Sequence, residues 1–100
     1  MIRNVVTGRL APDADPGAVA QLEAGLAGIA ALRLPGLLRA TVGRDAGLRE
    51  GGWDFAIVND FADADAYRAY DHDPDHLVHR TAIGAVCVEI ARVQFEVVDG

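Results

Sequence analysis

The clearest β-strand pattern in the chain is the central stretch Trp53-Asp54-Phe55-Ala56-Ile57-Val58-Asn59-Asp60-Phe61. Alternate residues of a strand point to opposite faces of a sheet. The positions that share one face here are apolar: Trp53, Phe55, Ile57 and Phe61. The stretch therefore predicts a strand that packs one face against a hydrophobic core.

On the N-terminal side, the sequence predicts two more strands and a helix between them. Residues 2–10 are β-branched and partly alternating, which favours a first strand. Asp15 followed by Pro16 is typical of a helix start, and Pro35-Gly36 ends the segment. An apolar stripe at helical spacing lies between these signals: Val19, Leu22, Leu26 and Ile29. Residues 37–43 form a second expected strand, and the glycine-rich residues 44–52 an exposed loop.

On the C-terminal side, two helix starts precede a last strand. Asp63 is a capping residue for a short helix that contains Tyr67 and Tyr70. Asp73-Pro74 repeats the combination of cap and proline, so a new helical segment begins there. Alternating apolar residues then predict a strand from about residue 90 to residue 98.

The resulting order, β-α-β-β-α-β, is that of an α+β ferredoxin-like domain spanning residues 1–100. We expect one four-stranded antiparallel sheet with the helices on one face. The strands carry apolar side chains on both faces, and a domain of this size leaves much apolar surface uncovered. This predicts a homodimer formed through the open sheet face.

Composition narrows the classes of partner. The chain has 15 acidic and nine basic residues, all nine of them arginine, for a net charge of −6. Nucleic acids and anionic membranes both select basic surfaces, so we expect neither as a partner. The chain opens without a basic and apolar leader, which favours a cytoplasmic protein, and the residue usage is typical of a GC-rich bacterial genome.

Motifs spread over nearly the whole chain resemble those of one family. They are Met1-Ile2-Arg3-Asn4-Val5-Val6, Leu34-Pro35-Gly36-Leu37, Val42-Gly43-Arg44, Gly52-Trp53-Asp54-Phe55 and Val93-Gln94-Phe95-Glu96-Val97. In order and spacing they resemble the Dabb family of stress-responsive dimeric α/β barrels, to which olivetolic acid cyclase-like proteins are related. The resemblance implies a homodimer packed sheet to sheet, with a small apolar ligand pocket in each half, which we expect between the paired sheets.

The resemblance also implies two catalytic residues. The cyclase closes a linear polyketide by aldol condensation without metal or organic cofactor, using a Tyr and a His six residues later, after a Pro. Tyr70 and His76, after Pro74, have this spacing. Two positions differ from the family pattern: Asn4 stands where many members have His, and Asp73-Pro74 replaces the usual His-Pro pair.

These residues suit the chemistry of an aldol reaction. It needs a base that removes a proton next to a carbonyl and a donor that holds the enolate oxygen. His76 would lie in the first turn of a helix, where the positive helix end favours the neutral ring. Tyr70 would orient that ring or donate to the oxyanion. The predicted pocket residues are Asn4, Val6, Ile57, Asn59 and His79.

Three interpretations of the function stay open on the sequence. The chain is a Dabb protein that binds a ligand without catalysis, a cofactor-independent polyketide cyclase, or a monooxygenase of the α/β barrel type, with or without haem. A tyrosine at helical spacing and a histidine near a helix start are also common as structural residues. His72, His76 and His79 could suggest a metal, but Pro74 separates His72 from the others, and we predict no metal and no cofactor.

Overall fold

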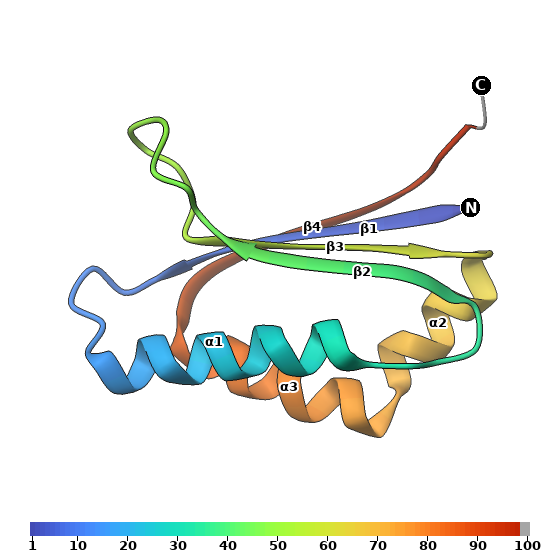
Figure 1. The fold of residues 1–100 in the computed structure, drawn as a ribbon, viewed down its shortest axis with the longest axis horizontal. Helices are drawn as coiled ribbons and strands as arrows, with labels where there is room; N and C mark the ends of the chain where they lie inside the picture. The colour runs from blue at the N-terminus through green and yellow to red at the C-terminus, as the bar shows by residue number, and fades with distance from the viewer. Residues whose placement is uncertain (99–100) are drawn as a thin grey trace.

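The structure, a computed structural model, describes residues 1–98. Its strands and helices follow one another in the order β-α-β-β-α-α-β, as drawn in Figure 1. The strands are β1 (Ile2–Leu10), β2 (Leu37–Arg44), β3 (Phe55–Phe61) and β4 (Cys87–Glu96). The helices are α1 (Pro16–Ala31), α2 (Ala64–His72) and α3 (Pro74–Val86).

The four strands form one antiparallel sheet in the order β2-β3-β1-β4. All three helices lie on one side of it, and within residues 1–98 its other side carries no helix (Figure 1). We call these two sides the helix-covered face and the open face. The predicted ferredoxin-like fold is confirmed, with the second helical region divided into α2 and α3 at Asp73.

Each helix begins where the sequence places an aspartate. The carboxylates of Asp15, Asp63 and Asp73 accept hydrogen bonds from backbone N–H groups three residues later, at 2.8, 2.8 and 2.9 Å. These bonds satisfy donors that a helix start otherwise leaves without partners. The cap residues thus fix where the chain leaves the sheet and turns along it.

Two strands, β3 and β4, have bounds that differ by two or more residues from the sequence prediction. β3 begins at Phe55 instead of Trp53, because Asp54 bonds to β1 through both backbone and carboxylate, the latter accepting from Leu10 N–H at 2.7 Å. Trp53 lies beside the strand end, with the Arg9 guanidinium 4.4 Å from its ring centre. β4 covers residues 87–96 instead of 90–98, since the chain passes from α3 directly into pairing opposite Leu10.

The hydrophobic core lies between the helix-covered face and the helices α1 and α3. Its buried members come from α1, β3 and α3: Leu22, Leu26, Ile29, Phe55, Ile57 and Ile83. Gly8 of β1 is part of this packing, because a Cβ there would collide with the ring of Phe55. Among residues 1–98, no helix has the length and apolar character needed to cross a membrane.

Candidate functional site

The junction of α2 and α3 positions His76. Asp73 follows the last turn of α2, and its backbone N–H bonds to the carbonyl of Tyr70 at 3.1 Å. The carboxylate of Asp73 accepts the backbone N–H of His76 itself, at 2.9 Å. His76 is therefore held in the first turn of α3, as predicted, by a residue that also ends α2.

Tyr70 and His76 form a stacked pair. Their ring centres are 3.8 Å apart and their planes differ by 26°. Both are buried, with 3% of Tyr70 and 5% of His76 exposed. Phe61 packs against the same tyrosine, with ring centres 4.9 Å apart. The imidazole packs against the face of the phenol ring, and no hydrogen bond joins the two side chains.

A chain of side-chain amides leads from β4 to the tyrosine hydroxyl. Gln94 donates to Asn4 at 2.9 Å, Asn4 donates to Asn59 at 2.9 Å, and Asn59 donates to the Tyr70 hydroxyl at 3.2 Å. Asn4 and Asn59 lie opposite each other on β1 and β3 and are 4% and 0% exposed. Because the hydroxyl oxygen of Tyr70 accepts from Asn59, its own proton is free to be donated elsewhere.

Asn4, Tyr70 and His76 line a cavity of about 50 Å³ that opens to solvent. The wall consists of strand residues from the helix-covered face and of residues from all three helices: Asn4, Val6, Ile29, Ile57, Tyr67, Tyr70, Asp71, His76, Arg80, Ile83, Ile90 and Arg92. The sequence predicts a pocket between paired sheets. The cavity instead lies within a single chain, between sheet and helices, because Asn4, Val6 and Ile57 point toward the helices.

Burial sets the protonation of the stacked pair. It raises the pKa of Tyr70 to about 12, although the hydrogen bond from Asn59 opposes the shift. Burial also lowers the pKa of His76, and the nearby charge of Arg80 adds to this, while the Tyr70 carbonyl, Asp71 and Asp73 oppose it. The structure thus holds a neutral imidazole beside a protonated phenol. The Nδ1 atom of that imidazole is buried and has no hydrogen-bond partner of good geometry within residues 1–98.

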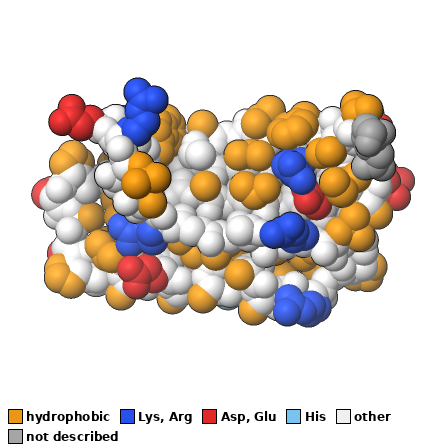
Figure 2. Space-filling view, turned by 45° about the horizontal axis from the view of Figure 1, so that its top comes forward, with side chains coloured by type: hydrophobic (Ala, Val, Ile, Leu, Met, Phe, Trp, Pro, Cys, Tyr) orange, Lys and Arg blue, Asp and Glu red, His pale blue; other side chains and the backbone are white. Residues whose placement is uncertain are grey.

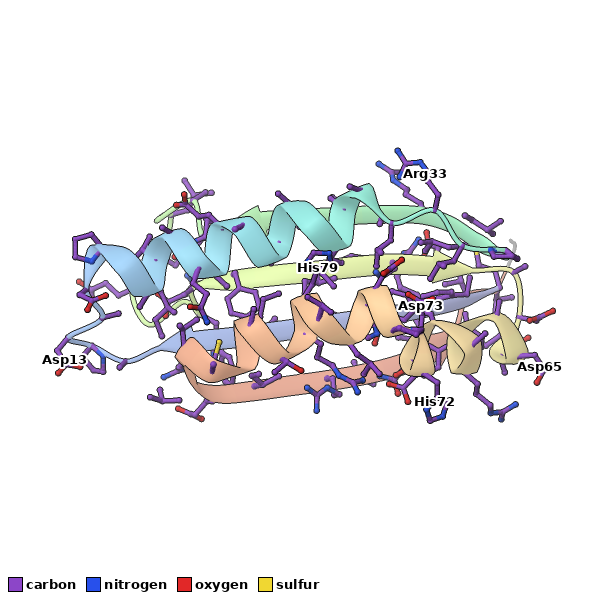
Figure 3. The ribbon with its side chains drawn as sticks, turned by 90° about the horizontal axis from the view of Figure 1, so that it is seen from below. Asp13, Arg33, Asp65, His72, Asp73 and His79 are labelled. Carbon is purple, nitrogen blue, oxygen red and sulfur yellow. The ribbon has the colours of Figure 1, made fainter. Side chains whose placement is uncertain are left out.

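Of the predicted site residues, the structure brings most together. Tyr70, His76, Asn4, Val6 and Ile57 line the cavity. Asn59 lies directly behind that wall and bonds to two of its members, Asn4 and Tyr70. His79 does not line this cavity. It lies in a shallow depression between α1 and α3, against Gly28 (Figure 3).

Sequence reasoning missed the charged part of the wall, which is Asp71, Arg80 and Arg92. Arg80 follows His76 by four residues on α3, so helical spacing alone could have placed it beside the histidine. Arg92 could not be found this way. Its position depends on which strand pairs with β4, and the sequence does not state the register.

The three histidines do not converge. His76 is buried in the cavity, His79 packs against α1, and His72 lies exposed on the outer side of α2 (Figure 3). In the part of the chain that the structure describes, no three His, Cys, Asp or Glu side chains are grouped as a metal site would need.

The comparison with family models decides the family. The chain matches the Dabb model, described as Stress responsive A/B Barrel Domain, over residues 2–97. The chain belongs to the Dabb family. The resemblance inferred from the sequence motifs is thereby confirmed. No curated protein matches this Dabb chain.

Solved structures support the assignment of fold. A dimeric ferredoxin-like protein of unknown function from Thermobifida fusca is 33% identical, with a TM-score of 0.83 over 96% of this chain and 90% of its own. A hydroxynitrile lyase from Passiflora edulis is 16% identical, with a TM-score of 0.77 over 99% and 94%. SnoaB, a cofactor-independent oxygenase from Streptomyces nogalater solved as a point mutant, is 22% identical, with a TM-score of 0.70 over 99% and 94%.

Proposed function

We propose that this Dabb protein is a cofactor-independent acid–base enzyme that acts on a small apolar carbonyl compound, as a homodimer. The observation that carries the proposal is the stacked pair of Tyr70 and His76 in the wall of the cavity. The raised pKa keeps the hydroxyl proton on Tyr70, and the lowered pKa favours the neutral imidazole of His76, in which one ring nitrogen accepts a proton. A buried pair of this kind can donate to an oxygen and accept from a carbon in the same cavity.

The proposed reaction starts with proton abstraction. The Tyr70 hydroxyl donates a hydrogen bond to the substrate carbonyl oxygen, and the His76 imidazole takes a proton from the adjacent carbon. The enolate carbon then attacks a second carbonyl carbon of the same molecule. A C–C bond forms, the second carbonyl oxygen takes up the proton held by His76, and the ring is closed with no change of oxidation state.

The magnitudes suit a modest enzyme. A positioned general base contributes roughly 10²- to 10⁴-fold, and a single oxyanion donor about 10²- to 10³-fold. The amide chain behind Tyr70 supports the role of the oxyanion donor. It holds the hydroxyl in place and leaves the hydroxyl proton available for a hydrogen bond to the substrate. The apolar wall of Val6, Ile57 and Ile83 would exclude water from the enolate.

An oxygenase is the second candidate. The same base could deprotonate an activated aromatic substrate, whose carbanion reacts with O₂ without a cofactor. SnoaB is described as a cofactor-independent oxygenase, and it resembles this chain in its fold. Oxygen uptake with substrate separates the two candidates, and a Soret band on haem titration would mark a haem-dependent variant.

Hydrogen–deuterium exchange tests the proposed base without knowledge of the natural substrate. The purified protein is mixed in D₂O with small 1,3-diketones, and NMR follows the loss of the protons between the carbonyls. We expect His76→Gln and Tyr70→Phe each to lower the protein-dependent exchange rate at least about 100-fold, as loss of base and donor imply. The control is His72→Gln, which changes an exposed histidine outside the cavity. Equal exchange by folded His76→Gln protein would refute the assignment of the base.

The proposed dimer uses the open face of the sheet. Val93 pairs with Val5, and Phe95 with Arg3, so all four point away from the helices. Val93 and Phe95 are 54% and 45% exposed, and Figure 2 shows hydrophobic side chains spread over this side of the molecule. Arg3 binds both carboxylate oxygens of Asp60 on this face, at 2.7 and 3.0 Å, and the exposed Arg39 lies opposite the same aspartate. The apolar part of such a face can be buried against its own copy.

Light scattering with two matched variants tests the interface. We expect the wild type at twice the 10.6 kDa mass of one chain, and Val93→Asp as a monomer. Val78→Asp is the control, because Val78 is 66% exposed on the helical side. A wild-type monomer at micromolar concentration, or a dimer lost only in Val78→Asp, would exclude the open face as the interface.

A further inference from the structure

The cavity wall carries charges that the proposed proton transfers do not use. Arg80 and Asp71 form an ion pair of 2.6 Å between Nη1 and Oδ1, and both line the cavity. Their charges cancel each other locally. Arg92 is the third charged residue of the wall. Its guanidinium makes no ion pair and no hydrogen bond to a side chain or backbone group within residues 1–98.

The position of Arg92 directs it into the cavity. Arg92 lies on β4 opposite Val6, and Val6 is itself a lining residue, so both belong to the helix-covered face. Tyr67 lines the same cavity, and the charge of Arg92 opposes the rise that burial gives the pKa of Tyr67. A cation without an ion pair therefore lies on the same wall as the stacked pair, at an exposed strand position.

This local charge runs against the charge of the whole chain. The protein carries a net charge of −6, which repels anions from its surface in general. In the cavity wall the sign of the charge is reversed, because two arginines stand against one aspartate and a neutral histidine. An unpaired guanidinium there provides a place for an anion in the cavity wall itself.

We propose that Arg92 selects a substrate with a carboxylate beyond the carbonyl that Tyr70 holds. The inference rests on the proposed function and narrows its substrate class to small apolar oxo acids. A single guanidinium presents two parallel N–H donors, which fit the two oxygens of a carboxylate. The apolar residues Ile57, Ile83 and Ile90 would contact the body of such a molecule.

A matched pair of probes tests the selectivity. Phenylacetate and phenylacetamide have the same apolar body and a carbonyl carbon, and differ in the charge of the end group. NMR titration gives the affinity of each for the wild type, for Arg92→Gln and for Arg33→Gln. Arg33 is the control because it points outward beyond the end of α1, far from the cavity wall, and its removal changes the net charge equally (Figure 3).

We expect the wild type and Arg33→Gln to bind phenylacetate about fivefold more tightly than the amide, the ratio that a partly exposed ion pair supplies. In Arg92→Gln the ratio should fall to about one, and the wild-type ratio should shrink with added salt. A ratio that survives in Arg92→Gln, or a wild type that prefers the amide, would overturn the assignment of Arg92.

The two proposals fail separately. If both probes bind and His76→Gln loses the exchange activity, while the ratio is independent of Arg92, the acid–base function stands and the carboxylate class is wrong. If neither probe perturbs any cavity resonance at millimolar concentration and no diketone exchanges, the cavity is not a ligand site, and both proposals are refuted together.

Discussion

The helix-covered face of the sheet has two ends that are built on different principles. At the end near Gly8, the ring of Phe55 lies against the glycine, and the buried Leu22 belongs to the same apolar cluster. At the other end of the same strands, Asn4 and Asn59 replace apolar side chains and bond to each other and to Tyr70. The first end is filled by close packing. The second is ordered by hydrogen bonds and leaves space beside it.

The contrast separates stability from function along two adjacent strands. A filled apolar end gains free energy from every buried methyl group. A polar end gains little net free energy from its hydrogen bonds, since these replace bonds to water, but it loses much when one partner is removed. We therefore expect substitutions at the two ends to differ in size and in what they change.

The largest effect is expected at the filled end. Leu22→Ala should lower the free energy of unfolding by about 3 kcal/mol, because Leu22 is 0% exposed and its removal leaves a cavity. Urea denaturation measures this change. Diketone exchange per folded molecule should stay at the wild-type rate, since Leu22 does not line the cavity. A loss of activity in folded protein would mean that the two ends are coupled.

At the polar end, Asn59→Leu should cost about 2 kcal/mol, because it leaves the buried Nδ2 of Asn4 without an acceptor. The double variant Asn4→Leu with Asn59→Leu should lose less than the sum of the two single variants. Replacing both partners removes the unsatisfied groups together with the bond. Additive losses in a denaturation cycle would show that the two amides do not depend on each other.

Tyr70→Phe sharpens the comparison, because it removes one oxygen atom from the polar end. We expect a loss of about 1 kcal/mol in unfolding free energy, since one donor of Asn59 then lacks its partner. Tyr67→Phe is the control, as its hydroxyl has no hydrogen-bond partner within residues 1–98 and its stability should change little. Equal losses for the two variants would contradict the described amide chain.

Sequence reasoning predicted the filled end better than the polar end. The buried face follows directly from two local patterns. These are the helical stripe of Leu22, Leu26 and Ile29 and the strand alternation of Phe55 and Ile57. Asp73 and Pro74 likewise placed His76 in the first turn of α3. The helix caps and apolar periodicities therefore predicted the order of the elements and the position of His76 in the first turn of α3.

The parts that were missed depend on contacts between distant segments. Arg92 joins the cavity through the pairing of β4 with β1, and Asn4 meets Gln94 across 90 residues of sequence. The sequence predicts His79 in the pocket, but its side chain lies against Gly28 of α1. On a helix, three residues leave His79 about 60° from His76, on the side opposite Arg80. The spacing of residues along α3 does not determine which face of the helix packs against the sheet.

The smallest effect concerns the response of the polar end to acid. The pKa of His76 lies below its ordinary value of 6.5 in the folded state. Above pH 7 the imidazole is neutral in both folded and unfolded protein, so it adds no slope to stability. As the pH falls below about 6.5, the unfolded chain binds a proton that the folded chain resists, and the free energy of unfolding declines.

Urea denaturation of the wild type and of His76→Gln between pH 8 and pH 5 measures this term. We expect a shallow decline below pH 6.5 in the wild type and a flatter profile in the variant, because glutamine does not titrate. Proton abstraction by the neutral ring should follow the same lowered pKa, so the pH at which diketone exchange falls to half its maximum should lie below 6.5. Identical stability profiles would mean that His76 gains its proton as readily inside the cavity as in the unfolded chain. The polar end would then no longer be a site that holds an uncharged base.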